Sequence, residues 1–207
     1  MMQSKMKIIG ITGGIGSGKS TVAHLLSEEY HIPIIDADEL VRIVSERAEV
    51  VSLIQKTFGH KCVTGKCQIN RTELARIVFG NETKRKQLNA IIHPLVREEF
   101  TRLSEGYRSN GEQFLIYDCP LLIEEKLQHD VDVVVLIYAD MQTRIDRIMK
   151  RSGMTHEQAT ARIDAQMDLD DKIPYADIVV YNNASKEQLK DSLKYLFQEI
   201  NTYERSE

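Results

Sequence analysis

The sequence predicts an α/β fold, with a doubly wound parallel sheet of five strands at its centre. Short apolar runs rich in β-branched residues are continuous rather than alternating, which is typical of strands covered on both faces of a parallel sheet. Segments with helical periodicity lie between most of these runs, and this alternation indicates a parallel α/β arrangement. The five runs are 6–12, 32–36, 114–117, 131–137 and 178–180.

The first two runs begin the predicted sheet. Residues 6–12 are followed at once by glycines and then by a helical pattern that includes Val22 and Leu26. This order is typical of a strand, a loop and a helix. In the run 32–36, Pro33 lies near the start, where its missing N–H disturbs a strand least.

A long stretch, 39–108, separates the second run from the third. It holds about 70 residues without a convincing core strand, which is too many for a single crossover. We therefore expect a mostly helical insertion that binds substrate, with an irregular part at 59–70. The helical segments predicted here are 39–58, 72–79, 82–92 and 94–107.

The remaining helical segments lie between and after the last two runs. Thr155 and Gln158 have the spacing of a capping box, and Gly153 suits the end of the preceding helix. These segments are 142–151, 156–166 and 186–203. We expect one domain with a core of 1–38, 110–140 and 173–207, a substrate-binding insertion of 39–109 and a lid of 141–172.

The composition is that of a globular protein with a small acidic excess. Of 207 residues, 42% are hydrophobic and 28% are charged, and the formal net charge is −4. Because the chain has no net positive field, duplex DNA or RNA is not an expected partner. A polyanionic substrate would need a local cluster of arginine and lysine. No unpaired apolar helix face is obvious, so we expect a monomer or a weak homo-oligomer.

The N-terminal segment and the cysteines point to the cytoplasm. The first residues lead into an apolar run that is too short for a signal peptide, and no small-residue cleavage site follows. We expect no membrane association. Cys62 and Cys67 have no nearby Cys or His pair to complete a zinc site, so these thiols and Cys119 are expected to be reduced.

Residues 13–20, with the sequence GGIGSGKS, match the phosphate-binding pattern G-x-x-x-x-G-K-[ST] between a predicted strand and helix. Glycines let backbone N–H groups turn inward around phosphates, and the following helix points its positive dipole end at the anion. We expect Lys19 to reach the β- and γ-phosphates of ATP and the Ser20 hydroxyl to ligate Mg²⁺. The alternative is a glycine-rich turn with a coincident lysine. The motif predicts a P-loop NTPase-type fold.

Two carboxylates follow the second predicted strand. Asp36 and Asp38 lie at its carboxyl end, where open parallel sheets place their ligands. A kinase that phosphorylates an alcohol needs a group that orients the hydroxyl and accepts its proton. The alternative is a helix N-cap at either aspartate. One of the two can cap while the other takes part in the chemistry.

Arginines are concentrated in the predicted lid. Arg147 and Arg151 have i, i+4 spacing, so their guanidinium groups lie on one face of a helix. A solvated charged face is the ordinary explanation. A phosphotransferase with an acidic net charge also needs cations for its transition state, and a mobile arginine-bearing segment commonly supplies them. Further cations of this region are Arg144, Lys150, Arg162 and Lys172.

From end to end, the chain resembles the dephospho-coenzyme A kinase family. Segment 10–21 is similar to that family's opening, 36–38 (DAD) to its second signature and 92–97 (IHPLVR) to its third. Segment 118–124 (DCPLLIE) resembles the family pattern D-x-P-L-L-[FI]-E. The family's lid pattern falls on Arg147, Arg151, Arg162, Ile163 and Gln166, and its last strand on Ala176, Asp177 and Asn182.

This resemblance implies ATP-dependent phosphorylation of the ribose 3′-hydroxyl of dephospho-coenzyme A, which yields coenzyme A and ADP. It favours Asp38 as the general base. Asp118, after a buried strand, is expected either to hold a water on Mg²⁺ as a Walker B aspartate or to cap a helix. The pair His93-Pro94 would by pattern alone indicate a helix break, but the resemblance implies that His93 binds the acceptor.

The expected site residues form four sets. The catalytic set is Asp38, Lys19 and Arg147. The ATP-binding set is Gly14, Ile15, Gly16, Ser17, Gly18, Lys19, Ser20, Thr21, Arg147, Arg151 and Asn182. The set that binds dephospho-coenzyme A is Thr12, Asp38, His93, Arg97, Pro120, Leu121 and Arg162. The Mg²⁺ set is Ser20 and Asp118.

The chain departs from the family pattern at a few positions of the nucleotide side. Arg144 stands where glutamine is usual, and 181–184 (YNNA) where an Asp-Asn pair and a glycine are common.

Two other kinds of protein would share the phosphate loop. A nucleoside-monophosphate type of kinase would differ in its acceptor. A nucleotide-dependent switch protein would leave the His-Pro and Asp-x-Pro-Leu-Leu segments without a role.

Overall fold

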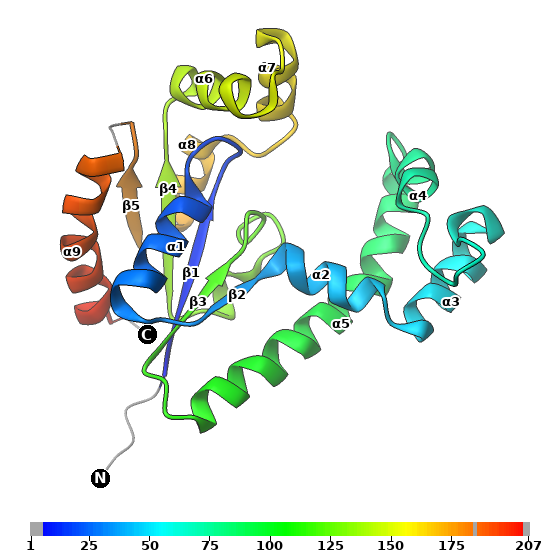
Figure 1. The fold of residues 1–207 in the computed structure, drawn as a ribbon, viewed down its shortest axis with the longest axis horizontal. Helices are drawn as coiled ribbons and strands as arrows, with labels where there is room; N and C mark the ends of the chain where they lie inside the picture. Colours follow the sequence, from blue (N-terminus) through cyan, green and yellow to red (C-terminus); the bar gives the residue numbers. More distant parts are fainter. Residues whose placement is uncertain (1–5, 184–185, 205–207) are drawn as a thin grey trace. The chain divides into compact units, whose positions relative to one another are not determined.

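A computed structural model describes residues 6–183 and 186–204. The chain divides into two compact units, one formed by 1–36 with 107–207 and the other by 37–106. The first unit contains a sheet, and the second is helical (Figure 1). Ala184, part of the departure at 181–184, lies outside the described residues.

The first unit is built on a parallel five-stranded sheet in the order β2-β3-β1-β4-β5 (Figure 1). The predicted α/β class and strand number are thus confirmed. The strands are β1 (Lys7–Gly13), β2 (Ile34–Asp36), β3 (Phe114–Asp118), β4 (Val133–Tyr138) and β5 (Ile178–Tyr181). Its helices are α1 (Lys19–Tyr30), α6 (Met141–Ser152), α7 (His156–Asp164), α8 (Leu169–Lys172) and α9 (Lys186–Thr202), with the short η2 (Leu127–His129) and η3 (Ile173–Tyr175).

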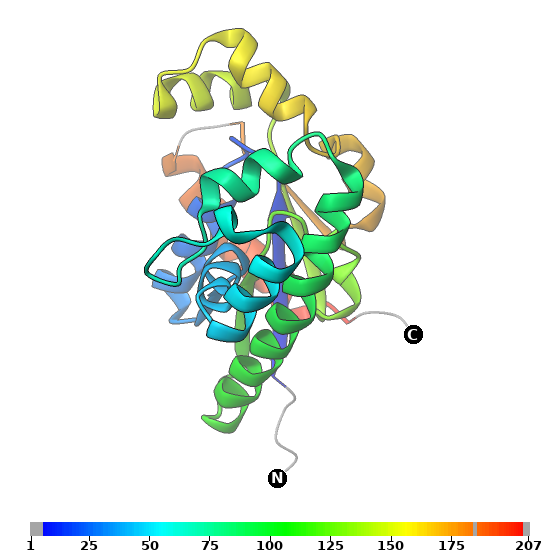
Figure 2. The same ribbon diagram turned by 90° about the vertical axis from the view of Figure 1, so that its right-hand side faces the viewer.

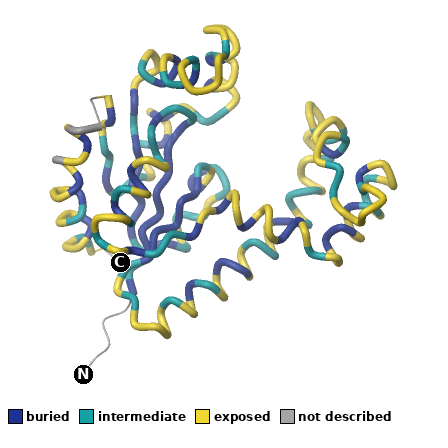
Figure 3. Tube along the Cα trace, viewed as in Figure 1, coloured by how far each residue is buried: buried dark blue, intermediate teal, exposed yellow. Residues whose placement is uncertain are grey.

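Side chains of β1 alternate between the two faces of the sheet, as the pleat of a strand requires. Ile9 and Ile11 are fully buried in a core to which α1 and α9 contribute. Gly10 faces the other way, where an added Cβ would lie 2.9 Å from side-chain atoms of Leu122 and Val131. Figure 3 shows the strands buried along most of their length. Burial on both faces explains why the apolar runs are continuous.

The fourth strand begins later than the run 131–137 predicts. β4 starts at Val133, and the preceding Asp132 carboxylate accepts a hydrogen bond from the Ile8 N–H at 2.8 Å. Val131 packs against Gly10 instead of extending the strand. The Asp132 N–H also donates to Ile8 O at 2.9 Å, so both the backbone and the side chain of Asp132 bind β1 just before β4 begins.

Helices α6 and α7 form a pair beyond the carboxyl ends of β1 and β4 (Figures 1 and 2). Thr155 and Gln158 make both hydrogen bonds of the predicted capping box, and Gly153 ends α6 with a left-handed φ of 64°. Both of these predictions are confirmed. The pair has its own apolar cluster, against which Ile15 of the phosphate loop packs. The cluster consists of Ile145, Ile148, Ala159 and Ile163.

The second unit contains α2 (Ala37–Ser45), α3 (Ala48–Phe58), η1 (His60–Cys62), α4 (Arg71–Val78) and most of α5 (Glu82–Ser109). The prediction of one helix over 39–58 is wrong, because the chain turns between α2 and α3. Arg47 has an extended backbone there and forms an ion pair with Glu99 of α5. The break lets Val44 and Ile54 reach the same apolar cluster.

The predicted break at His93-Pro94 is also wrong. α5 runs through Pro94 without interruption, although an internal proline removes one backbone hydrogen bond and costs about 3 kcal/mol. Ile92 before the proline and Leu95 and Val96 after it all contribute to the cluster of this unit. Burial on both sides of Pro94 therefore offsets the local preference for a break.

Two further properties concern the described ranges 6–183 and 186–204 alone. They contain no helix that is both long and apolar enough to span a bilayer. They also contain no group of three or more His, Cys, Asp or Glu side chains placed to hold a metal ion. Cys62, Cys67 and Cys119 carry free thiols, and burial raises the pKa of the Cys62 thiol.

Candidate active site

The phosphate loop connects the end of β1, at Gly13, with the start of α1, at Lys19. Gly16 and Gly18 have left-handed φ angles of 81° and 91°, which favour glycine. Gly18 is the N-cap residue of α1, and no side chain of the described residues forms a capping hydrogen bond at this end of the helix. The open N–H groups and the dipole of α1 are therefore available to an anion at the loop.

Two glycines of the loop leave space for side chains from distant segments. An added Cβ on Gly18 would lie 2.2 Å from Nδ2 of Asn182, and one on Gly14 would lie 2.5 Å from Nη2 of Arg144. A Cβ added at Gly16 would meet backbone instead, because it would lie 2.8 Å from the Arg144 carbonyl oxygen. Close contacts therefore favour glycine at all three positions, and a left-handed φ favours it further at Gly16 and Gly18.

Replacing Gly18 by alanine is expected to abolish high-affinity ATP binding. The new Cβ would meet Asn182 in a backbone conformation that disfavours side chains. Gly111→Ala is a matched control, since its φ of 84° is similar but no atom lies within 4 Å. Titration calorimetry with ATP should show loss of binding for Gly18→Ala alone. Equal affinities in the two variants would contradict the importance of the close contact.

Lys19 connects two oxygen-bearing side chains. Its ammonium forms an ion pair with Asp118 Oδ1, at the end of β3, and lies 3.5 Å from Ser20 Oγ. Asp118 is 2% exposed. In the register of the sheet it lies beside Ile11 of β1 on one side and Asp36 of β2 on the other. The ends of three neighbouring strands thus meet beside the loop.

The helix-capping alternative for Asp118 is not supported by the structure. Turns follow β3 from 120 to 126, and the next helical element is η2. A hydroxyl and a carboxylate are oxygen donors of the kind that Mg²⁺ prefers. Ser20 Oγ and Asp118 Oδ1 both lie near the Lys19 ammonium, so the chemistry of the donors at this position suits Mg²⁺.

Side chains of the predicted lid hold the carbonyl groups of the loop. Nε of Arg144 donates to Ile15 O at 3.0 Å. Nη1 of Arg147 lies 3.4 Å from Gly16 O and 3.3 Å from Ser17 O. Two arginine side chains of α6, three residues apart, therefore bind the backbone of the loop.

Two more residues bind the backbone of the loop. The Gln166 side chain accepts a hydrogen bond from the Ile15 N–H at 2.8 Å, and Nδ2 of Asn182 donates to Ser17 O at 2.8 Å. Asn182 is buried. Arg147 and Asn182 of the expected ATP-binding set thus lie at the loop. Gln166 belongs to the lid pattern of the family but to none of the four expected sets of site residues.

Arg144 also contacts the phosphate loop, although it is not among the expected site residues. It is 4% exposed, and its Nη2 has no hydrogen-bond partner among the described residues. Burial lowers the pKa of this guanidinium. The departure from the family's usual glutamine was a signal in the sequence, but nothing in the sequence shows which backbone group the arginine contacts.

Arg151 and Arg162 are not brought to the loop. Both are exposed, and neither makes a hydrogen bond or ion pair with the loop in the described part of the chain. Thr21 is likewise exposed, in the first turn of α1. Among the described residues, the hydrogen bonds from the predicted lid to the phosphate loop therefore come from Arg144, Arg147 and Gln166.

The turn after β3 carries the expected acceptor-binding residues of the first unit. The Thr12 hydroxyl donates to Pro120 O at 3.1 Å, and Leu121 beside it is 43% exposed. Thr12 itself is fully buried at the end of β1. The hydrogen bond from the Thr12 hydroxyl therefore connects the turn after β3 with β1, the strand that leads into the phosphate loop.

The remaining expected acceptor residues belong to the second unit. α2 begins at Ala37, so Asp36 precedes the helix and Asp38 lies in its first turn. The N-cap alternative is therefore wrong for Asp38, whose side chain is exposed. His93 and Arg97 are exposed on α5 with the i, i+4 spacing that places them on one helix face.

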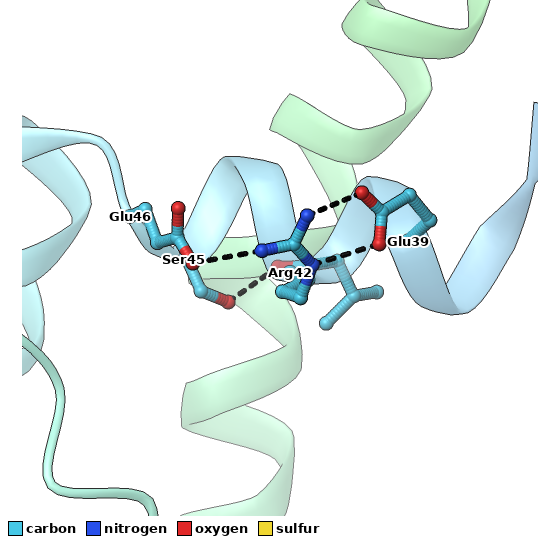
Figure 4. A network of polar contacts seen from close by, with 5 residues as sticks. Glu39, Arg42, Ser45 and Glu46 are labelled. Carbon is cyan, nitrogen blue, oxygen red and sulfur yellow. Dashed lines mark hydrogen bonds and ion pairs between the residues drawn. The ribbon is translucent and has the colours of Figure 1, made fainter.

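Ion pairs stabilise the helix that carries Asp38. Arg42 donates from Nε to Glu39 at 2.7 Å, and its Nη1 lies 3.3 Å from Glu46 (Figure 4). The hydrogen bond to Arg42 lowers the pKa of Glu39. Such exposed pairs contribute little to stability each, because water and salt screen their charges. They favour helical geometry directly after Asp38 at neutral pH.

Comparisons with known proteins agree on one family. A family model described as dephospho-CoA kinase matches residues 7–188. A dephospho-CoA kinase from Bacillus cereus is 42% identical over 195 residues, which cover 94% of this chain and 97% of the relative. The solved dephospho-CoA kinase from Campylobacter jejuni has a TM-score of 0.71 and 27% identity, covering 95% of this chain and 98% of its own.

A more distant structure supports the fold alone. A shikimate kinase from Bacteroides thetaiotaomicron has a TM-score of 0.52 at 15% identity, and the match covers 95% of this chain and 99% of that one. This structure is thus similar to the present chain in its overall fold. From the family model and the relatives that match nearly its full length, the chain belongs to the dephospho-CoA kinase family.

Proposed function

We propose that this protein transfers the γ-phosphoryl group of ATP to the ribose 3′-hydroxyl of dephospho-coenzyme A. The products are coenzyme A and ADP, and the reaction is the final step of coenzyme A synthesis. The observation that carries the proposal is the phosphate loop at the end of β1, with Lys19 between Ser20 and Asp118 in a chain of this family. This arrangement suits the donor half of a phosphoryl-transfer site.

The loop and lid residues would position and stabilise the transferred group. Backbone N–H groups at the start of α1 and the Lys19 ammonium would hold the β- and γ-phosphates. Phosphoryl transfer demands positioning and charge stabilisation more than covalent participation by the protein. Arg147 already contacts two loop carbonyls, so a small movement of its guanidinium can bring it to a phosphate bound at the loop.

The acceptor needs a group that orients its hydroxyl. In our proposal Asp38 accepts the proton of the ribose 3′-hydroxyl as the bond to phosphorus forms. His93 and Arg97 bind the acceptor through one face of α5, and Thr12, Pro120 and Leu121 are further acceptor-binding residues of the proposal. Arg162 and Arg151 belong to the proposed site as lid cations, although neither contacts the loop in the described structure.

The proposal includes Mg²⁺ and a cytoplasmic enzyme. Mg²⁺, held by Ser20 and Asp118, would neutralise charge on the β- and γ-phosphates of ATP. The free thiols suit the reducing conditions of the cytoplasm. We propose a monomer or a weak homo-oligomer that binds neither nucleic acid nor membrane, in line with the net charge of −4.

An acceptor panel tests the proposed function. ADP release from ATP is measured with dephospho-coenzyme A, AMP, other nucleosides and no acceptor. We expect acceleration by dephospho-coenzyme A alone. Acceleration by AMP would indicate a nucleoside-monophosphate type of kinase. Equal slow rates with and without acceptors would indicate a nucleotide-dependent switch protein.

Arg147→Met is expected to lower kcat/KM for ATP by at least about tenfold. A hydrogen bond to a charged group contributes about 1.5–3 kcal/mol, and methionine keeps the apolar stem while removing the guanidinium. Arg151→Met is the matched comparison on the same helix, with a smaller expected loss, because Arg151 is exposed and makes no hydrogen bond with the loop within 6–183 and 186–204. Steady-state kinetics at saturating dephospho-coenzyme A would show the difference. A larger loss in Arg151→Met would move the principal lid cation to that residue.

A further inference from the structure

A buried ion pair lies behind the turn that follows β3. Lys172, the last residue of α8, is fully buried, and its Nζ lies 2.7 Å from Oε1 of Glu124. Among the described residues, neither carboxylate oxygen of Glu124 accepts a hydrogen bond with good geometry. Lysine is almost never fully buried unless it is paired. The two charges therefore depend on each other.

The same ammonium also holds a backbone carbonyl. Nζ of Lys172 donates to Pro120 O at 3.2 Å, and the Thr12 hydroxyl donates to the same oxygen at 3.1 Å. Thr12 lies at the end of β1, just before the phosphate loop, whereas Lys172 follows the two lid helices. One carbonyl in the turn is thus fixed from two parts of the chain that are distant in sequence.

A fixed carbonyl fixes the whole peptide plane. The peptide bond between Pro120 and Leu121 is trans and planar, so the Leu121 N–H points opposite to Pro120 O. Because that oxygen faces two buried side chains, the N–H is directed away from them. In the described ranges no group accepts a hydrogen bond from this N–H. The turn therefore presents a backbone donor at a residue that is 43% exposed.

Stability alone does not explain this arrangement. Taking two charges out of water costs about as much as their attraction returns, and apolar residues often replace a buried pair without loss. An apolar pair at Lys172 and Glu124 could fill the same space, but it could not donate a hydrogen bond to Pro120 O. The feature specific to lysine is the orientation of the carbonyl.

We propose that Lys172 is a positioning residue for the acceptor substrate. Through Pro120 O it orients the Leu121 N–H toward dephospho-coenzyme A, and Glu124 holds the ammonium in place. The inference rests on the proposed function, because that function supplies the acceptor which the N–H meets. Lys172 does not touch the reacting atoms and performs no proton transfer.

The test uses two full-length variants and the wild type. Lys172→Met alone would leave the buried Glu124 carboxylate unpaired, so the kinetic variant is Lys172→Met with Glu124→Gln, which removes both charges at similar volume. Its KM for dephospho-coenzyme A is expected to rise about tenfold, as for loss of a hydrogen bond to a charged group. Its KM for ATP is expected to stay within about twofold. Unchanged values for both substrates would overturn the proposal.

Glu124→Gln is the matched control, because its amide oxygen can still accept a hydrogen bond from the Lys172 ammonium and so hold it at Pro120 O. Its KM for dephospho-coenzyme A is expected to remain within about twofold of the wild type. If Glu124→Gln alone raises this KM as much as the double variant does, the carboxylate rather than Lys172 orients the turn, and the proposal is wrong.

Amide hydrogen exchange gives a readout that does not depend on turnover. The Glu125 N–H donates to Leu121 O at 2.9 Å and reports the order of the turn. We expect its exchange to be about tenfold faster in the double variant than in Glu124→Gln. Equal exchange in both would overturn the positioning role. If the wild type fails to phosphorylate dephospho-coenzyme A, the proposed function is wrong, while the exchange measurement still decides what Lys172 does.

Discussion

Asp38→Asn is expected to lower kcat by about 10²- to 10⁴-fold, the usual cost of losing a group that accepts a proton in the transition state. Asparagine has nearly the same shape, can still accept a hydrogen bond from the ribose hydroxyl and lacks the basicity of a carboxylate. KM for dephospho-coenzyme A should therefore change much less than kcat. Steady-state kinetics with both substrates varied would measure the two effects.

Asp36→Asn is the matched control for this prediction. Asp36 stands directly before α2, in the N-cap position, and asparagine caps a helix about as well as aspartate. The control should therefore retain both stability and most of its turnover. If Asp38→Asn were as active as the wild type while Asp36→Asn lost turnover, the general base would be Asp36, and the role proposed for Asp38 would be wrong.

Lys19→Gln is expected to lower kcat by about 10²- to 10³-fold, as for removal of one preorganised donor to developing charge. The substitution also leaves Asp118, which is 2% exposed, without its ion-pair partner. Breaking a buried pair on one side costs about 3–5 kcal/mol of stability. A lower melting temperature should therefore accompany the loss of activity.

A second variant separates the two effects of losing Lys19. Lys19→Gln combined with Asp118→Asn leaves no unpaired buried charge, so its melting temperature should recover toward that of the wild type. Its activity should not recover, because the Lys19 cation is still missing at the phosphates and the proposed Mg²⁺ ligand Asp118 is also replaced. Recovery of turnover together with stability would mean that Lys19 acts through folding and not through the bound nucleotide.

The sheet could be predicted because its signal is local. Strands such as β4 are buried on both faces, so each one is a short continuous apolar run in the sequence. The errors occurred where tertiary packing overrides a local preference. Pro94 remains inside α5 because apolar residues on both sides of it are packed in one cluster. The turn at Arg47 is stabilised by Glu99, which is distant in the sequence.

The candidate site divides in the same way. The phosphate loop is one contiguous motif, so its glycines and Lys19 could be recognised from the sequence. The contacts of Arg144 and Gln166 with Ile15 could not, because each joins segments that only the fold brings together. Lys172 could be listed as a cation near the lid, but the sequence does not indicate that it is buried, because a lysine in a charged segment is normally exposed.

The most direct test of the proposed function is the position of the new phosphate. Dephospho-coenzyme A is incubated with ATP, Mg²⁺ and the wild-type protein, and the product is examined by phosphorus NMR. We predict one new phosphomonoester on the ribose 3′-oxygen, formed in equal amount with ADP. A phosphate on the 2′-oxygen, or ADP released with free phosphate and unchanged dephospho-coenzyme A, would contradict the proposal.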